Sequence, residues 1–148
     1  MKFGLEHEQE AAEAYATITG NNVFKAGLVI NPSCFYLGTS PDRKVIDPNS
    51  VPMYGLLEIK CPNSDSITNL KYLTLVNNSY KLKSSHEYYY QIMGQMGLTG
   101  ALWCDLFIWC KDDYHLERIN CLPGKWQEIK QKLDIFYFNC FLPKCVRY

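Results

Sequence analysis

The stretch Gly55-Leu56-Leu57-Glu58-Ile59-Lys60-Cys61-Pro62 has the pattern of a short buried strand that carries two charged side chains. The apolar run follows a glycine and is stopped by a proline, which has no amide hydrogen to donate to a strand ladder. Because side chains alternate across a strand, Glu58 and Lys60 are expected to share one face, opposite the face of Leu57. A carboxylate and an amine at this spacing are unusual in an apolar core and favour a site that holds a cation beside a polarised water.

A second candidate carboxylate lies upstream, at the end of another apolar run. The run Cys34-Phe35-Tyr36-Leu37-Gly38-Thr39 leads into Ser40-Pro41-Asp42, a tripeptide of turn-forming residues. The sequence therefore predicts that Asp42, Glu58 and Lys60 form one constellation.

Glu8 is the third candidate carboxylate, and it lies on the first expected helix, Lys2 to Thr19, which Gly20 ends. It falls inside the apolar stripe of that helix, which consists of Leu5, Ala11, Ala12, Tyr15 and Ile18. A carboxylate that faces inward needs a partner, because burying its charge alone is costly. Two interpretations stay open: Glu8 forms an ion pair at the rim of the core, or it faces the same cation as Glu58.

The rest of the chain predicts an alternation of strands and helices. In the first half, we expect strands over 23–30 and 34–39 joined as a hairpin, a loop over 43–53 with Asp47 in a turn, and the strand at 55–61. A short helix is expected over 67–76, and a second helix is opened by the capping box Ser84-Ser85-His86-Glu87 and runs to about Gly100. Strands over 102–110 and 114–121 and a last helix from Pro123 complete the chain. This order predicts an α/β (α+β) fold with a central mixed β-sheet flanked by helices, in one domain over residues 1–148.

Two helices carry informative faces. In the helix after His86, the core face is expected to consist of Tyr89, Ile92, Met93 and Met96. An adjacent face carries Tyr88, Gln91 and Gln95, because residues three and four apart are neighbours. Amides on that face either orient water or phosphate oxygens, or satisfy backbone groups. The last helix has an apolar stripe formed by Trp126, Ile129, Leu133, Phe136 and Cys140, which predicts packing against the body.

Composition limits the function classes. The 148 residues are 47% hydrophobic and 14% aromatic, which indicates a folded protein. Fifteen basic and fifteen acidic residues balance to zero, which disfavours a general nucleic-acid-binding protein with a basic excess. The seven cysteines are odd in number and contain no C-x-x-C pair, which favours buried thiols in a reducing, intracellular compartment, the cytoplasm or nucleus of a host. No apolar run reaches the ~20 residues of a membrane span.

With these motifs in place, the chain resembles the PD-(D/E)xK nucleases, in particular the YqaJ and lambda-exonuclease branch. The matching residues follow in chain order: Gly4, Glu8, Ala11, Tyr15, Thr19 and Gly20 in the opening helix, then Ser40-Pro41-Asp42, Leu57 to Pro62, Tyr88, Gln91 and Met96, Trp103-Cys104-Asp105, and Glu117-Arg118-Ile119. The resemblance covers nearly the whole chain and implies the restriction-endonuclease-like core of these nucleases. Two positions depart from the family's pattern: Arg43 stands where glycine is common, and Met93 where a second glutamine is often found.

The resemblance implies a metal site. Asp42 and Glu58 would hold a divalent ion together with the backbone carbonyl of Ile59, and Glu8 would complete the acidic cluster directly or through water. Mg²⁺ or Mn²⁺ is expected, because these ions prefer hard oxygen ligands with room for water and phosphate.

The resemblance also implies the chemistry. Lys60 would orient or help to deprotonate the attacking water, and Gln91 would position the water or the scissile phosphate. The expected function is a metal-dependent deoxyribonuclease, an exonuclease on duplex DNA ends in recombination or repair. An endonuclease of the same fold and a non-catalytic DNA-binding or assembly module are the alternatives. The implied partners are duplex DNA, further copies of the chain (a ring-shaped trimer in relatives) or a recombination partner protein. An iron–sulfur relative is disfavoured, because Cys140 and Cys145 lack the clustered spacing that such proteins use.

Overall fold

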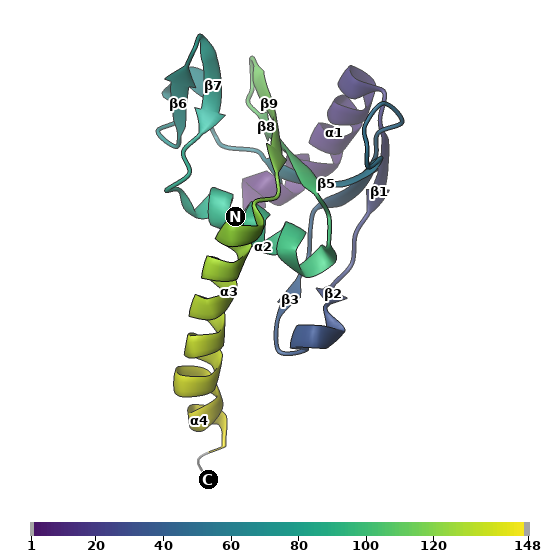
Figure 1. The fold of residues 1–148 in the computed structure, drawn as a ribbon. Coiled ribbons are helices and arrows are strands. Elements are labelled where there is room, and N and C mark those ends of the chain that lie inside the picture. Colours follow the sequence, from purple (N-terminus) through teal and green to yellow (C-terminus); the bar gives the residue numbers. More distant parts are fainter. Residues whose placement is uncertain (1, 147–148) are drawn as a thin grey trace.

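The central feature of the computed structural model, which describes residues 2–146 and their side chains from residue 7 onward, is a mixed β-sheet (Figure 1). Within those residues the sheet has five strands in the order β1-β4-β5-β8-β9. Their bounds are Asn22–Lys25, Arg43–Ile46, Tyr54–Lys60, Trp103–Trp109 and Tyr114–Asn120. The pairing of β5 with β8 is parallel, and the other pairings in this sheet are antiparallel. The predicted fold class and the central position of the strand that carries Glu58 are confirmed.

Helices cover both faces of this sheet. Helix α1 (Lys2–Thr19) lies on one face, where Tyr15 packs with Leu57 and Phe107 in a buried cluster. Helix α2 (Glu87–Thr99) covers the other face through Ile92, Met93 and Met96, and α3 (Pro123–Phe136) packs against α2. Strands β5 and β8 are largely buried on both faces because each face is covered by a helix.

Helices α1 and α2 end where the sequence predicts, whereas the predicted N-cap of α2 is wrong. Gly20 and Gly100 have φ of +72° and +77°, and their amides donate to carbonyl oxygens one turn back. The N-cap of α2 is His86 rather than a serine of the expected capping box. Its Nδ1 accepts the amide hydrogen of Tyr88 at 3.3 Å, and its ring contacts the rings of Tyr72 and Tyr88. The imidazole therefore serves as the acceptor that serine was expected to supply.

The expected strands over 23–30 and 34–39 are shorter in the structure. Strand β1 ends at Lys25, and β2 (Val29–Ile30) instead pairs with β3 (Gly38–Thr39) in a separate ribbon. The predicted hairpin connection is present, but residues 32–34 form a 3₁₀ turn. Asn31 caps that turn by accepting the amide hydrogen of Ser33 at 2.9 Å, and a proline follows it at the first helical position. Local capping therefore prevents these residues from extending.

The prediction of a loop over 43–53 is wrong for the first half of this segment. Strand β4 (Arg43–Ile46) pairs with both β1 and β5 in antiparallel register. Two charged residues at its start hid the strand pattern, although Arg43 is buried and only Lys44 is exposed. The second half is a turn in which Asp47 accepts hydrogen bonds from the amide of Asn49 and the hydroxyl of Ser50, which confirms its predicted turn role.

The short helix predicted over 67–76 is also wrong. Only Ile67–Asn69 forms a 3₁₀ turn, and the segment continues into a hairpin of β6 (Leu73–Val76) and β7 (Ser79–Leu82). Asn77 and Asn78 have positive φ values, which is the geometry that a two-residue hairpin turn requires. The β-branched residues and this Asn-Asn pair were the signal for the hairpin.

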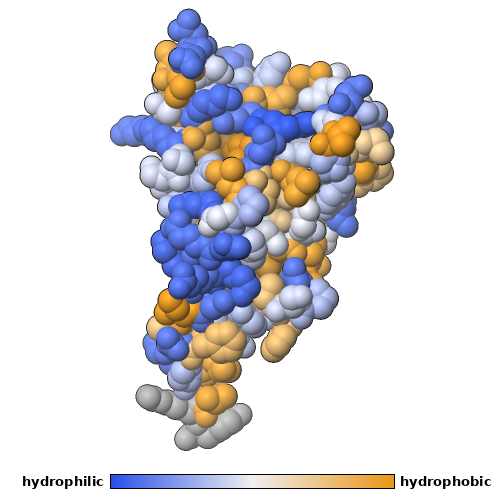
Figure 2. All heavy atoms as spheres, in the orientation of Figure 1, coloured by the Kyte–Doolittle hydropathy of each residue, from blue (hydrophilic) through white to orange (hydrophobic). Residues whose placement is uncertain are grey.

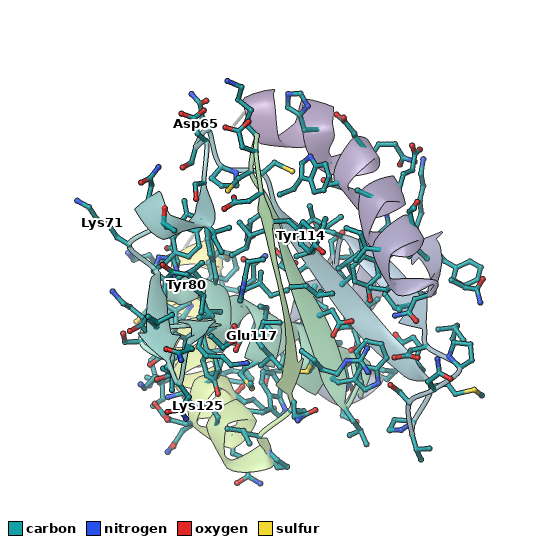
Figure 3. The ribbon with its side chains drawn as sticks, turned by 90° about the horizontal axis from the view of Figure 1, so that it is seen from above. Asp65, Lys71, Tyr80, Tyr114, Glu117 and Lys125 are labelled. Atoms are coloured by element: carbon teal, nitrogen blue, oxygen red, sulfur yellow. The ribbon has the colours of Figure 1, made fainter. Side chains whose placement is uncertain are left out.

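The hairpin is held against the edge of the main sheet by Glu117 of β9. In Figure 3 this side chain points toward the hairpin that carries Tyr80. Glu117 accepts the amide hydrogen of Leu82 at 2.8 Å and lies 3.7 Å from the amine of Lys81. Lys83 donates to the carbonyl oxygen of Lys71. The lysines of this segment therefore tie the hairpin to itself and to β9.

The C-terminal helix buries only part of its predicted stripe, although its later residues Asp134, Tyr137 and Phe138 contact Tyr36, which lies between β2 and β3. Ile129 is buried, whereas Leu133 is 36% and Phe136 is 59% exposed, so the predicted packing of the stripe is wrong beyond its second turn. The helix continues through a π-helix (Tyr137–Phe141) into α4 (Leu142–Cys145) and projects beyond the sheet (Figures 1 and 2). Of the predicted stripe, Cys140 is also exposed. The sheet and α2 end before this part of the helix, so they offer it no surface to cover.

The cysteines and the helices add two facts about the described residues. All seven cysteines lie within residues 2–146, and none of them forms a disulfide there. Cys34, Cys104 and Cys110 are buried as predicted, whereas Cys140 and Cys145 are exposed. None of the helices over residues 2–146 is long and apolar enough to cross a membrane.

The contact between α2 and α3 depends on a glycine. A Cβ atom at Gly97 would lie 2.1 Å from the indole of Trp126, whereas a Cβ at Gly94 of the same helix would have no neighbour within 4 Å. Gly97→Ala is expected to lower the free energy of unfolding by about 1–3 kcal/mol through overpacking. Gly94→Ala, the matched control, is expected to raise it by about 0.5–1 kcal/mol because alanine favours the helix. Urea unfolding followed by circular dichroism measures both, and equal effects would contradict the packing described.

Candidate active site

Glu58 is the most enclosed carboxylate of the candidate site. It lies on the α2 face of β5 with 1% of its surface exposed. Its Oε1 accepts hydrogen bonds from Lys60 Nζ at 2.5 Å and from Gln91 Nε2 at 2.7 Å, and its Oε2 accepts one from Gln95 Nε2 at 2.8 Å. Donors on β5 and α2 therefore stabilise a charge that would otherwise be costly to bury.

Lys60 lies beside Glu58 at the carboxyl end of β5. Its amine is 4.4 Å from the ring centroid of Tyr88 and donates to Gln91 Oε1 at 3.3 Å. Its side chain is 19% exposed, so the amine lies at the border between the core and solvent. The predicted shared face of Glu58 and Lys60 is confirmed. Tyr88 and Gln91, which the helical spacing placed on one face of the helix, both contact Lys60 from α2.

Gln95 is a residue of this site that the sequence placed on the correct helix face without assigning it a role. The family pattern led us to expect a missing amide at Met93, but Met93 is fully buried in the core. Gln95, four residues after Gln91, supplies the second amide to Glu58. Its own Oε1 is buried and has no hydrogen-bond partner. The spacing of four residues on the helix was the available signal.

Asp42 lies close to Glu58, immediately before the neighbouring strand β4. It precedes β4, whose first residue pairs with Leu57, and its Oδ2 accepts the amide hydrogen of Ile59 at 2.7 Å. Burial, followed by the negative charge of Glu58, raises the pKa of Asp42 to about 7, against the lowering effect of the Ile59 amide. The structure therefore brings Asp42 and Glu58 close enough to repel each other.

Glu8 reaches the site from α1, but its carboxylate is held by a cation of the chain. Arg43 Nη1 donates to Glu8 Oε1 at 2.6 Å, which confirms the ion-pair interpretation. The charge of Glu8 still contributes to the raised pKa of Asp42, so the two carboxylates are neighbours. Among the side chains of residues 7–146, no three of His, Cys, Asp or Glu are gathered so as to hold a metal ion. These contacts do not test the expected direct or water-mediated contact of Glu8 with a metal ion.

The donor atoms at this site fit a hard divalent cation. Asp42 and Glu58 supply two carboxylates, and Mg²⁺ is commonly bound through one or two carboxylates, with water and phosphate completing its shell. The repulsion that raises the pKa of Asp42 is the interaction that a cation would relieve. The unpaired Oε1 of Gln95 is a further oxygen at the site without a partner of its own.

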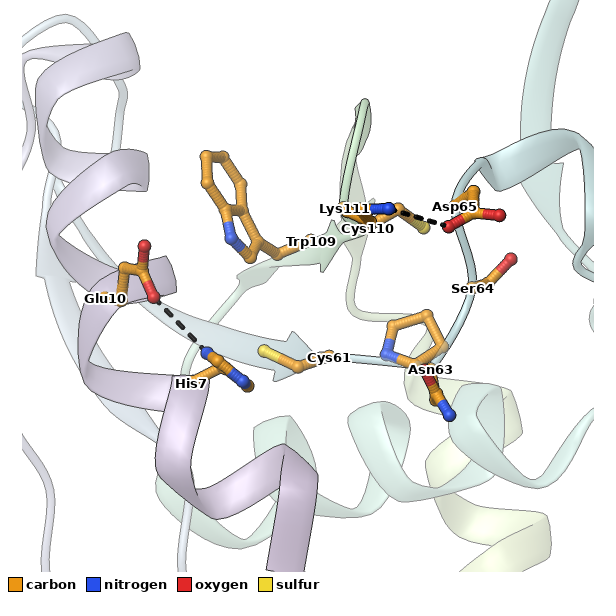
Figure 4. A pocket seen from close by; sticks show the side chains of 10 residues that line it. His7, Glu10, Cys61, Asn63, Ser64, Asp65, Trp109, Cys110 and Lys111 are labelled. Atoms are coloured by element: carbon orange, nitrogen blue, oxygen red, sulfur yellow. Dashed lines mark hydrogen bonds and ion pairs between the residues drawn. The ribbon is translucent and has the colours of Figure 1, made fainter.

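A separate pocket of about 280 Å³ opens on the opposite face of β5, at the carboxyl ends of β5 and β8 (Figure 4). Its lining includes His7 and Glu10 of α1, Cys61 and Trp109. Cys61 follows Lys60 and therefore faces the α1 side. Burial, then the charges of Glu8 and Asp42, raises the pKa of the Cys61 thiol to about 11. This thiol is thus protonated near neutral pH and is a poor nucleophile.

The raised pKa of Asp42 predicts a pH-dependent stability without metal. Because its pKa rises from 3.8 to about 7 on folding, this group stabilises the protein below pH 3.8, and that contribution is lost as the pH rises to 7. The loss is at most about 4 kcal/mol. In EDTA, Asp42→Asn is therefore expected to be more stable than the parent at pH 8 and about equal at pH 4, as measured by thermal melts.

The exposed turn variant Asp112→Asn serves as the control and is expected to follow the parent at both pH values. A melt in which Asp42→Asn is the less stable protein at pH 8 would show that the carboxylates do not converge.

Comparisons with known proteins agree with this geometry. The sequence profile of the YqaJ-like viral recombinase domain matches residues 1–102. Among solved structures, the chain is similar to LHK-Exo, an alkaline exonuclease from Laribacter hongkongensis, with 30% identity and a TM-score of 0.71. LHK-Exo in complex with dAMP gives 33% identity and a TM-score of 0.72.

In both cases the match covers 93% of this chain and 66% of the other, so the chain spans about two thirds of the length of those proteins. The comparison with curated proteins gives no match. The profile match covers well over half of the sequence and includes Glu8, Asp42, Glu58, Lys60 and Gln91. The chain belongs to the family of YqaJ-like viral recombinase domains.

Proposed function

We propose that this chain is a metal-dependent deoxyribonuclease that hydrolyses phosphodiester bonds at the ends of duplex DNA during recombination. The observation that carries the proposal is that Asp42 and Lys60 both lie close to the buried carboxylate of Glu58. The similarity to an alkaline exonuclease, one of whose structures contains dAMP, supports DNA as the substrate class.

Each side chain has a distinct part in the proposed reaction. Asp42, Glu58 and the backbone carbonyl of Ile59 would hold Mg²⁺ or Mn²⁺, which when bound supplies Lewis acidity and lowers the pKa of water. Lys60 Nζ, hydrogen-bonded to Glu58, orients the attacking water and offsets the negative charge that develops on the phosphate. Gln91 forms hydrogen bonds with both Lys60 and Glu58 and so fixes the position of the amine relative to the carboxylate.

Digestion of linear and covalently closed circular DNA tests the proposal. In Mg²⁺ or Mn²⁺, linear duplexes are expected to release nucleotides from their ends while closed circles remain intact, and EDTA is expected to stop the reaction. Cutting of closed circles would assign an endonuclease instead. Binding of DNA and metal without cleavage would assign a non-catalytic module. Digestion that continues in EDTA would contradict the proposed mechanism.

The assembly of the chain stays a prediction. We expect a homo-oligomer, such as the ring-shaped trimer, or a complex with a recombination partner. Light scattering of the purified protein, with and without duplex DNA, measures the molar mass of the assembly.

A further inference from the structure

Arg43 is a buried cation next to the proposed metal site. Its Nη1 donates to Glu8 Oε1 and to the backbone carbonyl of Asp42, both at 2.6 Å, and its Nη2 donates to Gln9 Oε1 at 3.3 Å. Only 10% of the Arg43 side chain is exposed. Several acceptors from α1 and the start of β4 therefore fix the guanidinium in one position.

The register of the sheet explains why this guanidinium reaches Glu8. Arg43 pairs with Leu57 of β5, and paired residues project to the same face, which is the face that α1 covers. Glu58, the residue after Leu57, belongs to the opposite face, where it contacts α2. Arg43 thus holds Glu8 on the α1 side of the sheet, away from the face that carries Glu58.

We propose that Arg43 is a positioning residue that keeps Glu8 out of the metal shell and thereby sets the affinity of the Asp42–Glu58 pair for a divalent cation. This inference rests on the proposed function. In residues 7–146 the charges around the site are the carboxylates of Glu8, Asp42 and Glu58 and the cations of Lys60 and Arg43. Arg43 repels an incoming cation and neutralises the carboxylate that would otherwise attract it.

Removal of Arg43 is therefore expected to tighten metal binding rather than weaken it. Arg43→Met keeps much of the side-chain volume and removes the charge, so it is expected to bind Mn²⁺ about tenfold more tightly, since a neighbouring unit charge shifts such equilibria by about 1–3 log units. Arg43→Lys keeps the charge and is expected to stay within about threefold of the parent. Titration of Mn²⁺, with the free ion followed by electron paramagnetic resonance, measures the affinity without any turnover.

Glu8→Gln provides the second, independent test. Because Arg43 already neutralises Glu8, this substitution is expected to change the Mn²⁺ affinity of the parent by less than about threefold. In the Arg43→Met background the same substitution is expected to abolish the gain, which is a coupling that a merely structural role of Arg43 would not produce.

The outcomes separate this inference from the proposed function. Weaker or unchanged binding by folded Arg43→Met, or a tenfold loss in Glu8→Gln alone, would overturn the role of Arg43 while leaving the metal site intact. If Arg43→Met does not fold, Glu8→Gln in the parent decides the question. If the parent itself binds no Mn²⁺, or if Asp42→Asn binds it equally well, the proposed metal-dependent function fails instead.

Discussion

Cleavage of linear duplex DNA is expected to fall by roughly a thousandfold or more when Glu58 is replaced by glutamine. The amide removes a negative charge from the proposed metal site and ends the ion pair with Lys60, whose amine lies 2.5 Å from Glu58 Oε1. Neither Asp42 nor Glu8 replaces it, because the first is bound to the amide of Ile59 and the second to Arg43. The initial rate of nucleotide release at saturating Mg²⁺ measures the effect.

Glu128→Gln is the control for the loss of one carboxylate. Glu128 lies on α3, where it pairs with Lys125 and Lys132 at the surface, and its replacement is expected to leave the rate within about twofold. Thermal melts in EDTA show whether Glu58→Gln is folded. A folded Glu58→Gln protein that still digests DNA at the parental rate would remove Glu58 from the reaction.

The largest expected loss of stability follows from Arg118→Met. Asp105 is buried in the middle of β8, where Arg118 donates to both of its oxygens, at 2.7 Å and 2.9 Å, and the hydroxyl of Tyr15 donates at 2.6 Å. Arg118 also pairs with Asp47 and lies 3.7 Å from the ring centroid of Trp103. Without the guanidinium, the carboxylate of Asp105 stays buried with the Tyr15 hydroxyl as a donor but with no counter-charge from Arg118, so the free energy of unfolding is expected to fall by about 3–5 kcal/mol.

Urea unfolding measures this loss, with Lys132→Met as the control. Lys132 forms an exposed ion pair with Glu128, whose removal is expected to cost less than about 1 kcal/mol. Similar losses for the two variants would mean that the network around Asp105 does not support the sheet.

The elements that were predictable from the sequence are those with strong apolar patterns. Strands β5 and β8 read as continuous apolar runs because helices cover both of their faces. Strand β4 did not, because its buried position at Arg43 is taken by a charged side chain that finds its acceptors only in the folded protein. The hairpin β6–β7 was missed because an apolar run interrupted by asparagines also fits a short helix.

In the candidate site, too, contacts within a local pattern were predictable, whereas contacts that depend on strand register were not. Alternation along β5 placed Glu58 beside Lys60, whereas the family resemblance assigned Gln91 to the same site, and the structure shows both contacts. The partnership of Glu8 with Arg43 depends on which residue of β4 pairs with Leu57, and register between distant strands is not encoded in a local pattern.

The parallel pairing of β5 with β8 has a consequence for any shortened form of this protein. The family match stops at residue 102, one position before β8 begins at Trp103. A fragment that ends there would keep every proposed catalytic side chain, yet it would make β5 an exposed edge strand with unpaired backbone groups. An exposed edge strand of this kind pairs with strands of other molecules and leads to aggregation. The smallest soluble unit that contains this site therefore extends at least through the strand that shields β5.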